Sequence, residues 1–121
     1  MIVKLRLMMM LVGLCFGLLF GSAAHGDTYT IRATSSNSWN PDFQHITKGN
    51  RIRWKNPSSN VLDHVVKSYG NNWNKNVRLD PGEATRKRFR RSGVFKYRCT
   101  LHSSLSNGNC NGMCGVVHVT S

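Results

Sequence analysis

Acidic residues are scarce in this chain, because five Asp and Glu residues face 17 Lys and Arg residues and give a net charge of +12. Such an excess of positive charge favours acidic partners, such as a redox protein, anionic lipid head groups or cell-wall polymer. Nucleic acid is the other usual partner of a basic chain, but the sequence contains no nucleic-acid-binding motif. We therefore expect an acidic partner or surface and no nucleic acid.

Long apolar runs are also rare. The single one extends from Leu7 to Phe20, and its 14 residues are fewer than the roughly 20 that span a bilayer. Lys4 and Arg6 precede this run and a segment of small residues follows it, which is the layout of a secretory signal. We expect a signal peptide over residues 1–26 that is removed on export to the periplasm or the extracellular space.

The mature chain would comprise residues 27–121, a length that suits one small monomeric domain with a single core. It would keep three of the four cysteines, because Cys15 lies in the signal peptide. In an exported protein, an odd number of cysteines indicates either an intermolecular bond or a thiol with its own chemistry. The mature chain would carry 15 basic and 5 acidic residues, a net charge of +10.

No segment of the mature chain has the apolar spacing of a helix. Apolar and polar residues instead alternate along short segments, most clearly at 29–33, 51–55 and 94–99, which is typical of strands with one buried face. Turn-forming residues separate these segments at 48–50, 56–60, 80–82 and 92–93. The spacing predicts an all-β sandwich of about eight short strands.

Cys99 and His102 stand at the end of one predicted strand, where a thiolate and an imidazole could reach a common point. A thiolate with imidazoles and a weak thioether suits copper that cycles between two oxidation states. A second histidine is required, and His64 is the best candidate because it begins an apolar run after a polar loop. His45 and His118 are weaker candidates, because alternation along a strand explains both without a ligand role.

Two other interpretations of the cysteines remain open. Cys99, His102, Cys110 and Cys114 could close a tetrahedral zinc site, although their spacing fits no common zinc module. Alternatively, Cys99 could form a disulfide with Cys110 or Cys114 in a metal-free, secreted binding domain. That second interpretation leaves the neighbouring histidines and Met113 unexplained.

Five segments resemble the blue-copper cupredoxins of the plastocyanin and pseudoazurin kind, in order and over nearly the whole mature chain. They are FQHITKGNRIRWKN (43–56), DHVV (63–66), LDPGEATRKRF (79–89), GVFKYRCTLH (93–102) and GMCGVVHV (112–119). The resemblance implies a Greek-key β-sandwich that holds one copper ion, Cu(I) or Cu(II), and carries single electrons between redox partners. It implies an electron carrier and not an enzyme. The alternative is a protein of the cell envelope that delivers copper, that is, a copper carrier or metallochaperone.

The resemblance also implies roles for individual residues. His64, Cys99, His102 and Met113 would be the copper ligands, with Met113 as the long axial one. His102 would be the port for electrons, and Leu101 and Leu105 would belong to the apolar rim around it. The sequence departs from the family in three places. Ten residues separate His102 from Met113, where relatives commonly have about four, and Leu101 stands where many relatives have proline. Val65 follows His64, where relatives often have an Asn or Thr whose side chain braces the cysteine loop.

The two remaining cysteines are expected to form a disulfide with each other. Free thiols beside Cu(II) would compete for the metal or reduce it, so oxidation of Cys110 and Cys114 is the stable outcome outside the cell. Asn111 and Gly112 favour a tight turn that could bring the two α-carbons within reach of a disulfide. Cys99 would then stay free for copper.

The basic segment RKRFRR (86–91) is expected to form part of a strand. Arg86, Arg88 and Arg90 would share one face, while Phe89 would point inward. This stripe is either a solvated surface that keeps the protein soluble or a surface that faces an acidic partner.

Overall fold

The computed structural model describes residues 26–121, so the expected signal peptide lies outside the described part apart from Gly26. All regular elements in this range are strands, and no helix in it is long and apolar enough to cross a membrane. There are nine strands, close to the expected number, and β2 has only two residues. They are β1 (Thr28–Ala33), β2 (Trp39–Asn40), β3 (Phe43–Thr47), β4 (Arg51–Lys55), β5 (His64–Tyr69), β6 (Asn76–Leu79), β7 (Ala84–Arg88), β8 (Gly93–Ser106) and β9 (Asn109–Thr120).

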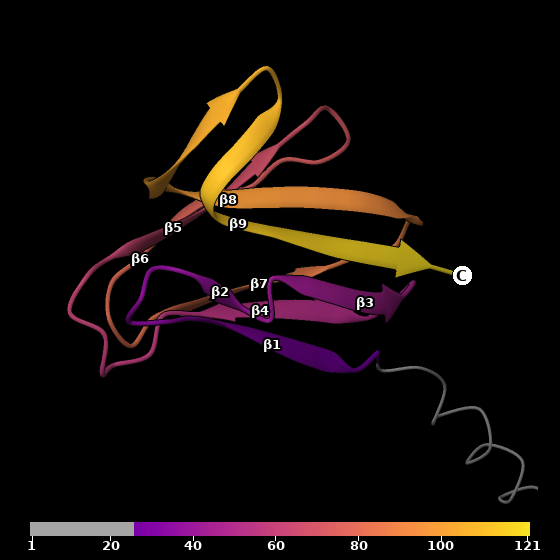
Figure 1. Ribbon diagram of the computed structural model, residues 1–121. Coiled ribbons are helices and arrows are strands. Elements are labelled where there is room, and N and C mark those ends of the chain that lie inside the picture. Colours follow the sequence, from indigo (N-terminus) through magenta and orange to yellow (C-terminus); the bar gives the residue numbers. More distant parts are fainter. Residues whose placement is uncertain (1–25) are drawn as a thin grey trace, which may run out of the picture.

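The strands form two sheets that lie face to face (Figure 1). One sheet has four strands in the order β2-β1-β4-β7, and the other has five in the order β3-β9-β8-β5-β6. β1 pairs with β4 and β3 pairs with β9 in parallel, whereas the other neighbours are antiparallel. The chain passes repeatedly from one sheet to the other, and the predicted all-β sandwich is confirmed.

The core fills the space between the sheets, because alternate residues of each strand point inward. The four-stranded sheet contributes Ile31, Ile52 and Trp54, and the five-stranded sheet contributes Tyr97 and Val117, all fully buried. The rings of Trp54 and Tyr97 meet edge to face with 5.3 Å between their centroids, which joins the two layers at the centre of the sandwich. The alternation therefore predicts the inward-facing residues correctly.

Tyr97 lies directly over Gly115, its partner in the pairing of β8 with β9. A Cβ atom built on Gly115 would stand 2.2 Å from the Tyr97 ring, too close for any side chain. Tyr97 is buried and packs against Trp39 as well as Trp54, so the ring has little space in which to move. Gly115 is thus required by packing and not by its backbone conformation.

We predict that Gly115→Ala lowers the free energy of unfolding by about 1–3 kcal/mol, the usual cost of inserting a methyl group into a filled core. Denaturant titration of residues 27–121 measures this change. Val116→Ala, on the outer face of the same strand, is the control and should cost less than about 1 kcal/mol. If the two variants lose the same free energy of unfolding, the Tyr97 ring can move away from the methyl group at position 115.

Candidate metal centre

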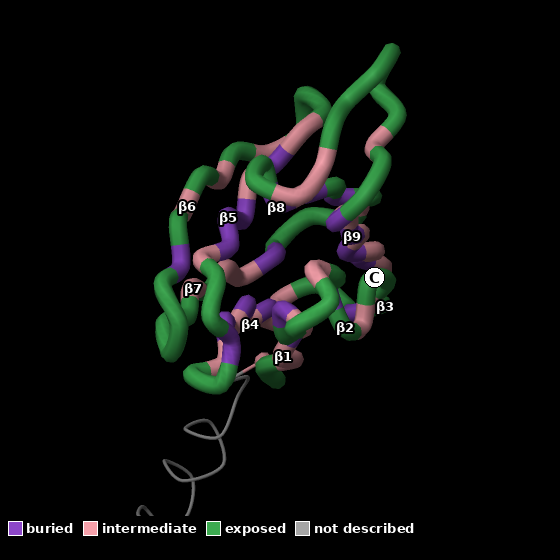
Figure 2. Tube along the Cα trace, turned by 60° about the vertical axis from the view of Figure 1, so that its left-hand side comes forward, coloured by how far each residue is buried: buried purple, intermediate pink, exposed green. Residues whose placement is uncertain are grey.

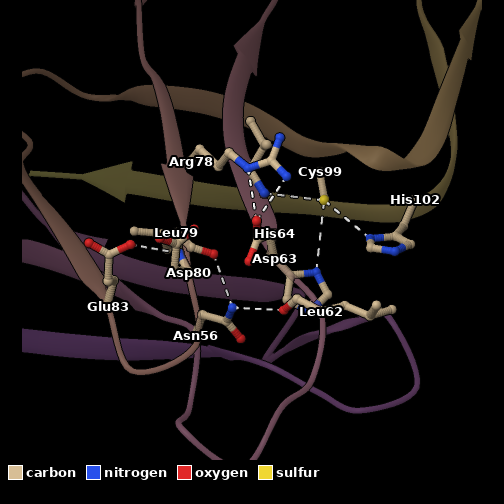
Figure 3. A network of polar contacts seen from close by, with 11 residues as sticks. Asn56, Leu62, Asp63, His64, Arg78, Leu79, Asp80, Glu83, Cys99 and His102 are labelled. Carbon is tan, nitrogen blue, oxygen red and sulfur yellow. Dashed lines mark hydrogen bonds and ion pairs between the residues drawn. The ribbon is translucent and has the colours of Figure 1, made fainter.

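Three side chains from two strands meet at one end of the five-stranded sheet (Figure 3). His64 is the first residue of β5, and Cys99 and His102 both belong to β8. The Cys99 Sγ atom lies 3.4 Å from Nδ1 of His102 and 3.9 Å from Nδ1 of His64. One possible ligand atom from each residue lies within 4.8 Å of the others, so the three could bind a single metal ion.

The three groups differ in their access to solvent. His64 and Cys99 are buried, whereas His102 is half-buried and forms the outer side of the cluster. Burial lowers the pKa of His64, and the nearby imidazole of His102 lowers it further. A lowered pKa keeps the His64 imidazole neutral at physiological pH, which is the form that binds a metal.

The sulfur of Cys99 also accepts a hydrogen bond from the main chain. The Val65 N–H donates to Sγ over 3.3 Å, so the strand that begins at His64 is tied to the thiol. On the other side, the Ser103 hydroxyl donates to the Cys99 carbonyl, and Arg98 donates to the Ser103 hydroxyl over 3.1 Å. These bonds brace the cysteine loop, a role that the resemblance assigns to an Asn or Thr after the first histidine.

Met113 stands opposite the loop that carries Cys99 and His102. Arg98 pairs with Cys114 and Ser103 pairs with Gly112, so the four residues 99–102 of β8 face Met113 alone. This irregularity is a large β-bulge, a feature that bends a strand and redirects its side chains. Met113 is fully buried, as Cys99 is, and the ten residues between His102 and Met113 in sequence do not separate them in the fold.

Those ten residues belong to a two-stranded ribbon that projects from the sandwich (Figure 1). Residues 103–106 pair with 109–112, and Asn107 and Gly108 form the turn with φ values of 52° and 75°. Two successive positive φ values favour the tight turn whose twist matches that of the strands. Figure 2 shows the end of the ribbon as exposed, so it lies outside the core.

The strand β9 bends sharply at the base of this ribbon. Four residues of extended strand span about 13 Å, yet the α-carbons of Cys110 and Cys114 are 6.1 Å apart. Gly112 permits the bend with a φ of +102°, and a Cβ built there would lie 2.4 Å from the carbonyl oxygen of His102. The hairpin turn itself is at residues 107–108 and not at Asn111 and Gly112, where the sequence predicts a tight turn.

A disulfide joins Cys110 to Cys114 across the bend. Within residues 26–121, Cys99 is then the single free cysteine, and it is buried. Both alternative interpretations of the cysteines are therefore wrong: the zinc series lacks two of its thiolates, and Cys99 forms no disulfide with Cys110 or Cys114. The bridge closes a short loop around Met113 and limits how far that residue can move.

Asn56 holds the loop that precedes His64. Its side-chain amide donates to the carbonyl oxygens of Leu62 and Leu79, each over 3.0 Å, and its Oδ1 accepts from Asn60 over 2.9 Å. The side chain is fully buried, so these bonds face little competition from water. Because Leu62 is two residues before His64, the bonds position the start of β5 (Figure 3).

A partly apolar surface lies beside the exposed edge of His102. His102 and Leu101 border a shallow depression whose other walls are Val61, Leu62 and the ion-paired Asp63 and Arg78. Leu101 is 47% exposed and Val61 is 90% exposed, unusually high values for large apolar side chains. Leu105, the other expected member of the rim, is also exposed but lies farther along the ribbon. Sequence reasoning did not place Val61 and Leu62 in this rim, although both follow the turn-rich segment 56–60, which indicates a surface loop.

The two weaker histidine candidates do not join the cluster. His45 and His118 are partners across β3 and β9, and their rings lie 5.5 Å apart on the outer face of the five-stranded sheet. The inner neighbours Ile46, Val117 and Val119 are buried, so both histidines follow the strand alternation. This agrees with the interpretation that strand alternation alone accounts for their positions.

Sequence reasoning misses three positioning residues. Asn56 has a weak signal, because it is a polar residue directly after a strand with one buried face and immediately before Pro57. Gly112 is expected from the sequence to lie in a turn, although its requirement comes from the nearby carbonyl of His102. Ser103 carries no sequence signal, because its role depends on the bulge that places its hydroxyl near the Cys99 carbonyl.

We predict that Gly112→Ala weakens copper binding at least about tenfold and destabilises the protein by roughly 1–3 kcal/mol, because the new methyl group pushes the His102 main chain away. Copper titration and denaturant unfolding measure the two effects. Gly108→Ala is the matched control, since Gly108 also has a positive φ but a Cβ atom placed on it would have nothing within 4 Å. If both variants bind copper equally, the contact with His102 is irrelevant to the site.

No protein-family model matches the sequence, and no curated protein sequence matches it. Solved structures do match the fold. An amicyanin variant in its reduced state matches with a TM-score of 0.63 and 19% identity, over 83% of this chain and 88% of the amicyanin chain. A purple cupredoxin from Nitrosopumilus maritimus matches with a TM-score of 0.56 and 21% identity, over 75% of this chain and 98% of that protein.

The copper-containing nitrite reductase of Thermus scotoductus SA-01 matches with a TM-score of 0.62 and 20% identity. The match covers 78% of this chain and 22% of the reductase, so it concerns only one part of that larger enzyme. At these identities the matches establish architecture alone. The chain described here has the cupredoxin fold that its sequence resemblance implies.

Proposed function

We propose that this protein is an exported, mononuclear blue-copper protein that carries single electrons between redox partners. The observation that carries the proposal is the convergence of two imidazoles and a buried thiol, with a buried methionine opposite them. The solved amicyanin structures that share the fold include a reduced Cu(I) form and an oxidised form. We extend that pair of states to this chain.

The spacing of the three groups fits one metal ion. Metal–sulfur bonds are about 2.3 Å long and metal–nitrogen bonds about 2.0 Å, so a sulfur and a nitrogen on one metal ion lie no more than about 4.3 Å apart. The observed separations of Cys99 Sγ from the two Nδ1 atoms are 3.4 and 3.9 Å, within that limit. His64, Cys99 and His102 would hold the copper ion, and Met113 would be the fourth ligand.

Bound copper would supply the redox chemistry by alternating between Cu(I) and Cu(II). The residues of this chain would keep the ligand geometry nearly constant. His64 and Cys99 are buried in a packed core, and the Val65 N–H donates to the sulfur. A site that imposes nearly the same arrangement on both oxidation states has a small reorganisation energy, which favours rapid electron transfer.

His102 is the proposed port for electrons, because it is the outermost of the three clustered groups. The exposed apolar residues Val61, Leu62 and Leu101 would exclude water from the contact with a partner protein. With its excess of positive charge, the chain favours an acidic redox partner. We propose that the protein is an electron carrier and not an enzyme, and that it acts as a monomer in the periplasm or outside the cell.

The copper proposal predicts an intense blue absorption band when Cu(II) is added to residues 27–121. Cys99→Ser should abolish the band, because the thiolate that donates charge to copper is lost. His118→Ala is the control and should leave the band nearly unchanged, since His118 lies on the outer face of the sheet. A parent protein that gives only a pale product would contradict the proposal.

The port proposal predicts that Leu101→Ser slows electron self-exchange at least about tenfold while leaving the blue band in place, because the apolar contact weakens. Val94→Ser is a matched control, since Val94 is also 47% exposed but lies on β8 away from the cluster. Self-exchange rates are measured from the broadening of NMR signals in mixtures of the oxidised and reduced protein. Slow exchange in the parent, combined with ready release of copper to an acceptor, would favour the metallochaperone alternative.

A further inference from the structure

The outer face of the four-stranded sheet carries a concentration of positive charge that the copper site does not use. Residues that point away from the core on β1, β4 and β7 include six basic side chains, here called the arginine face. The four strands of this sheet contain no Asp or Glu. The members of the arginine face are Arg32, Arg51, Arg53, Lys55, Arg86 and Arg88.

The register places these cations directly against one another. Arg53 of β4 pairs with Arg86 of β7, and Arg51 pairs with Arg88. On the other side of β4, Lys55 pairs with Arg32 of β1. Residues opposite each other in antiparallel strands, as in the two arginine pairs, lie about 4.5–5.5 Å apart at Cβ, and like charges in such pairs destabilise a sheet. The pairing therefore opposes folding and calls for an explanation outside the fold.

The protein itself does not neutralise this charge. In the described part of the chain, a single ion pair is formed, between Arg78 and Asp63, and it lies at the β5–β6 side of the five-stranded sheet. Arg53, at the centre of the arginine face, has a buried Nε atom without a hydrogen-bond partner among residues 26–121. The arginine face thus retains uncompensated charge.

We propose that the arginine face binds the surface of a bilayer that contains anionic phospholipids. Guanidinium groups bind phosphate oxygens through paired N–H donors, and basic residues near an anionic bilayer are attracted to it individually. The cations extend over three neighbouring strands and so form a two-dimensional array, as a planar charged surface requires. The expected stripe of Arg86, Arg88 and Arg90 is part of this array only through its first two members, because β7 ends at Arg88.

The chemistry of the arginine face argues against the other polyanions. Protein interfaces have an apolar or aromatic centre, but none of the exposed large apolar residues in the described chain lies on this sheet. Single-stranded nucleic acid binds along a line of charge with aromatic rings that stack on the bases, and the outward positions of β1, β4 and β7 carry no aromatic ring. Binding to an anionic lipid surface requires only the positive charge.

Attachment through this face leaves the candidate copper site accessible. His102 and its apolar surroundings belong to the end of the other sheet and to the loop before β5. The four-stranded sheet can therefore face lipid phosphates while the apolar end contacts a protein partner. The inference goes beyond the proposed electron-transfer function and does not depend on copper, because no member of the arginine face touches the His64, Cys99 and His102 cluster.

The test compares two double variants that remove the same charge from opposite faces. Arg53→Gln with Arg86→Gln changes the arginine face, and Lys67→Gln with Lys96→Gln changes the outer face of the five-stranded sheet. Residues 27–121, which contain all the described strands, are sedimented with phosphatidylcholine vesicles containing about one third phosphatidylglycerol. We expect the first pair to weaken binding at least about tenfold and the second pair to weaken it less than about threefold.

Three further measurements make the outcome specific. Binding to vesicles of phosphatidylcholine alone should be absent, and binding to the mixed vesicles should weaken steeply between ~50 and ~500 mM salt. The Arg53 and Arg86 variant should melt no lower than the parent, because a repulsive pair is removed. If that variant unfolds, Arg51→Gln with Arg88→Gln replaces it.

Equal losses in the two double variants would overturn the proposal, because they would show attraction by net charge alone. Absence of binding to the mixed vesicles would overturn it directly. A preference for duplex DNA or an acidic protein that is lost only in the Arg53 and Arg86 variant would assign the face to that other partner. Cys99→Ser protein should bind vesicles as the parent does, so a failed copper proposal and a failed membrane proposal can be told apart.

Discussion

The pairing of β8 with β9, and the one place where it is interrupted, determines where most of the candidate ligands lie. Four residues of β8 face Met113 at the bulge, so Cys99 and His102 come close to a methionine that the sequence places far away. Regular pairing on either side fixes the bulge in position. Gly112 allows the two main chains to approach at this point, and the Cys110–Cys114 bridge closes the bend beside it.

Much of this architecture was predictable, because strand alternation depends on neighbouring residues that can be read directly. The inward positions of Trp54, Phe89, Tyr97 and Cys99 follow from it, and all four are buried. The placement of Cys99 and His102 at a strand end also depends on local sequence only. Their meeting with His64 required knowledge of which strands are neighbours, and for that the sequence resemblance was needed.

The remaining features depend on contacts between distant residues and could not be read from local sequence. Asn56 bonds to a carbonyl 23 residues away, and nothing in its own neighbourhood indicates that partner. The residues between His102 and Met113 could equally have formed an irregular loop, since many of them are turn-forming residues. Whether Val61 and Leu62 are exposed depends on how the loop held by Asn56 crosses the end of the sandwich.

The ribbon has a consequence for how this fold can diversify. Because its arms pair with each other, residues added in matched pairs near Asn107 and Gly108 would lengthen the projection without shifting the register at its base. The geometry around the thiol and the reach of the projecting arm can therefore vary independently. Natural variation or deliberate grafting at the tip could change which proteins the molecule recognises while its metal-binding chemistry stays the same.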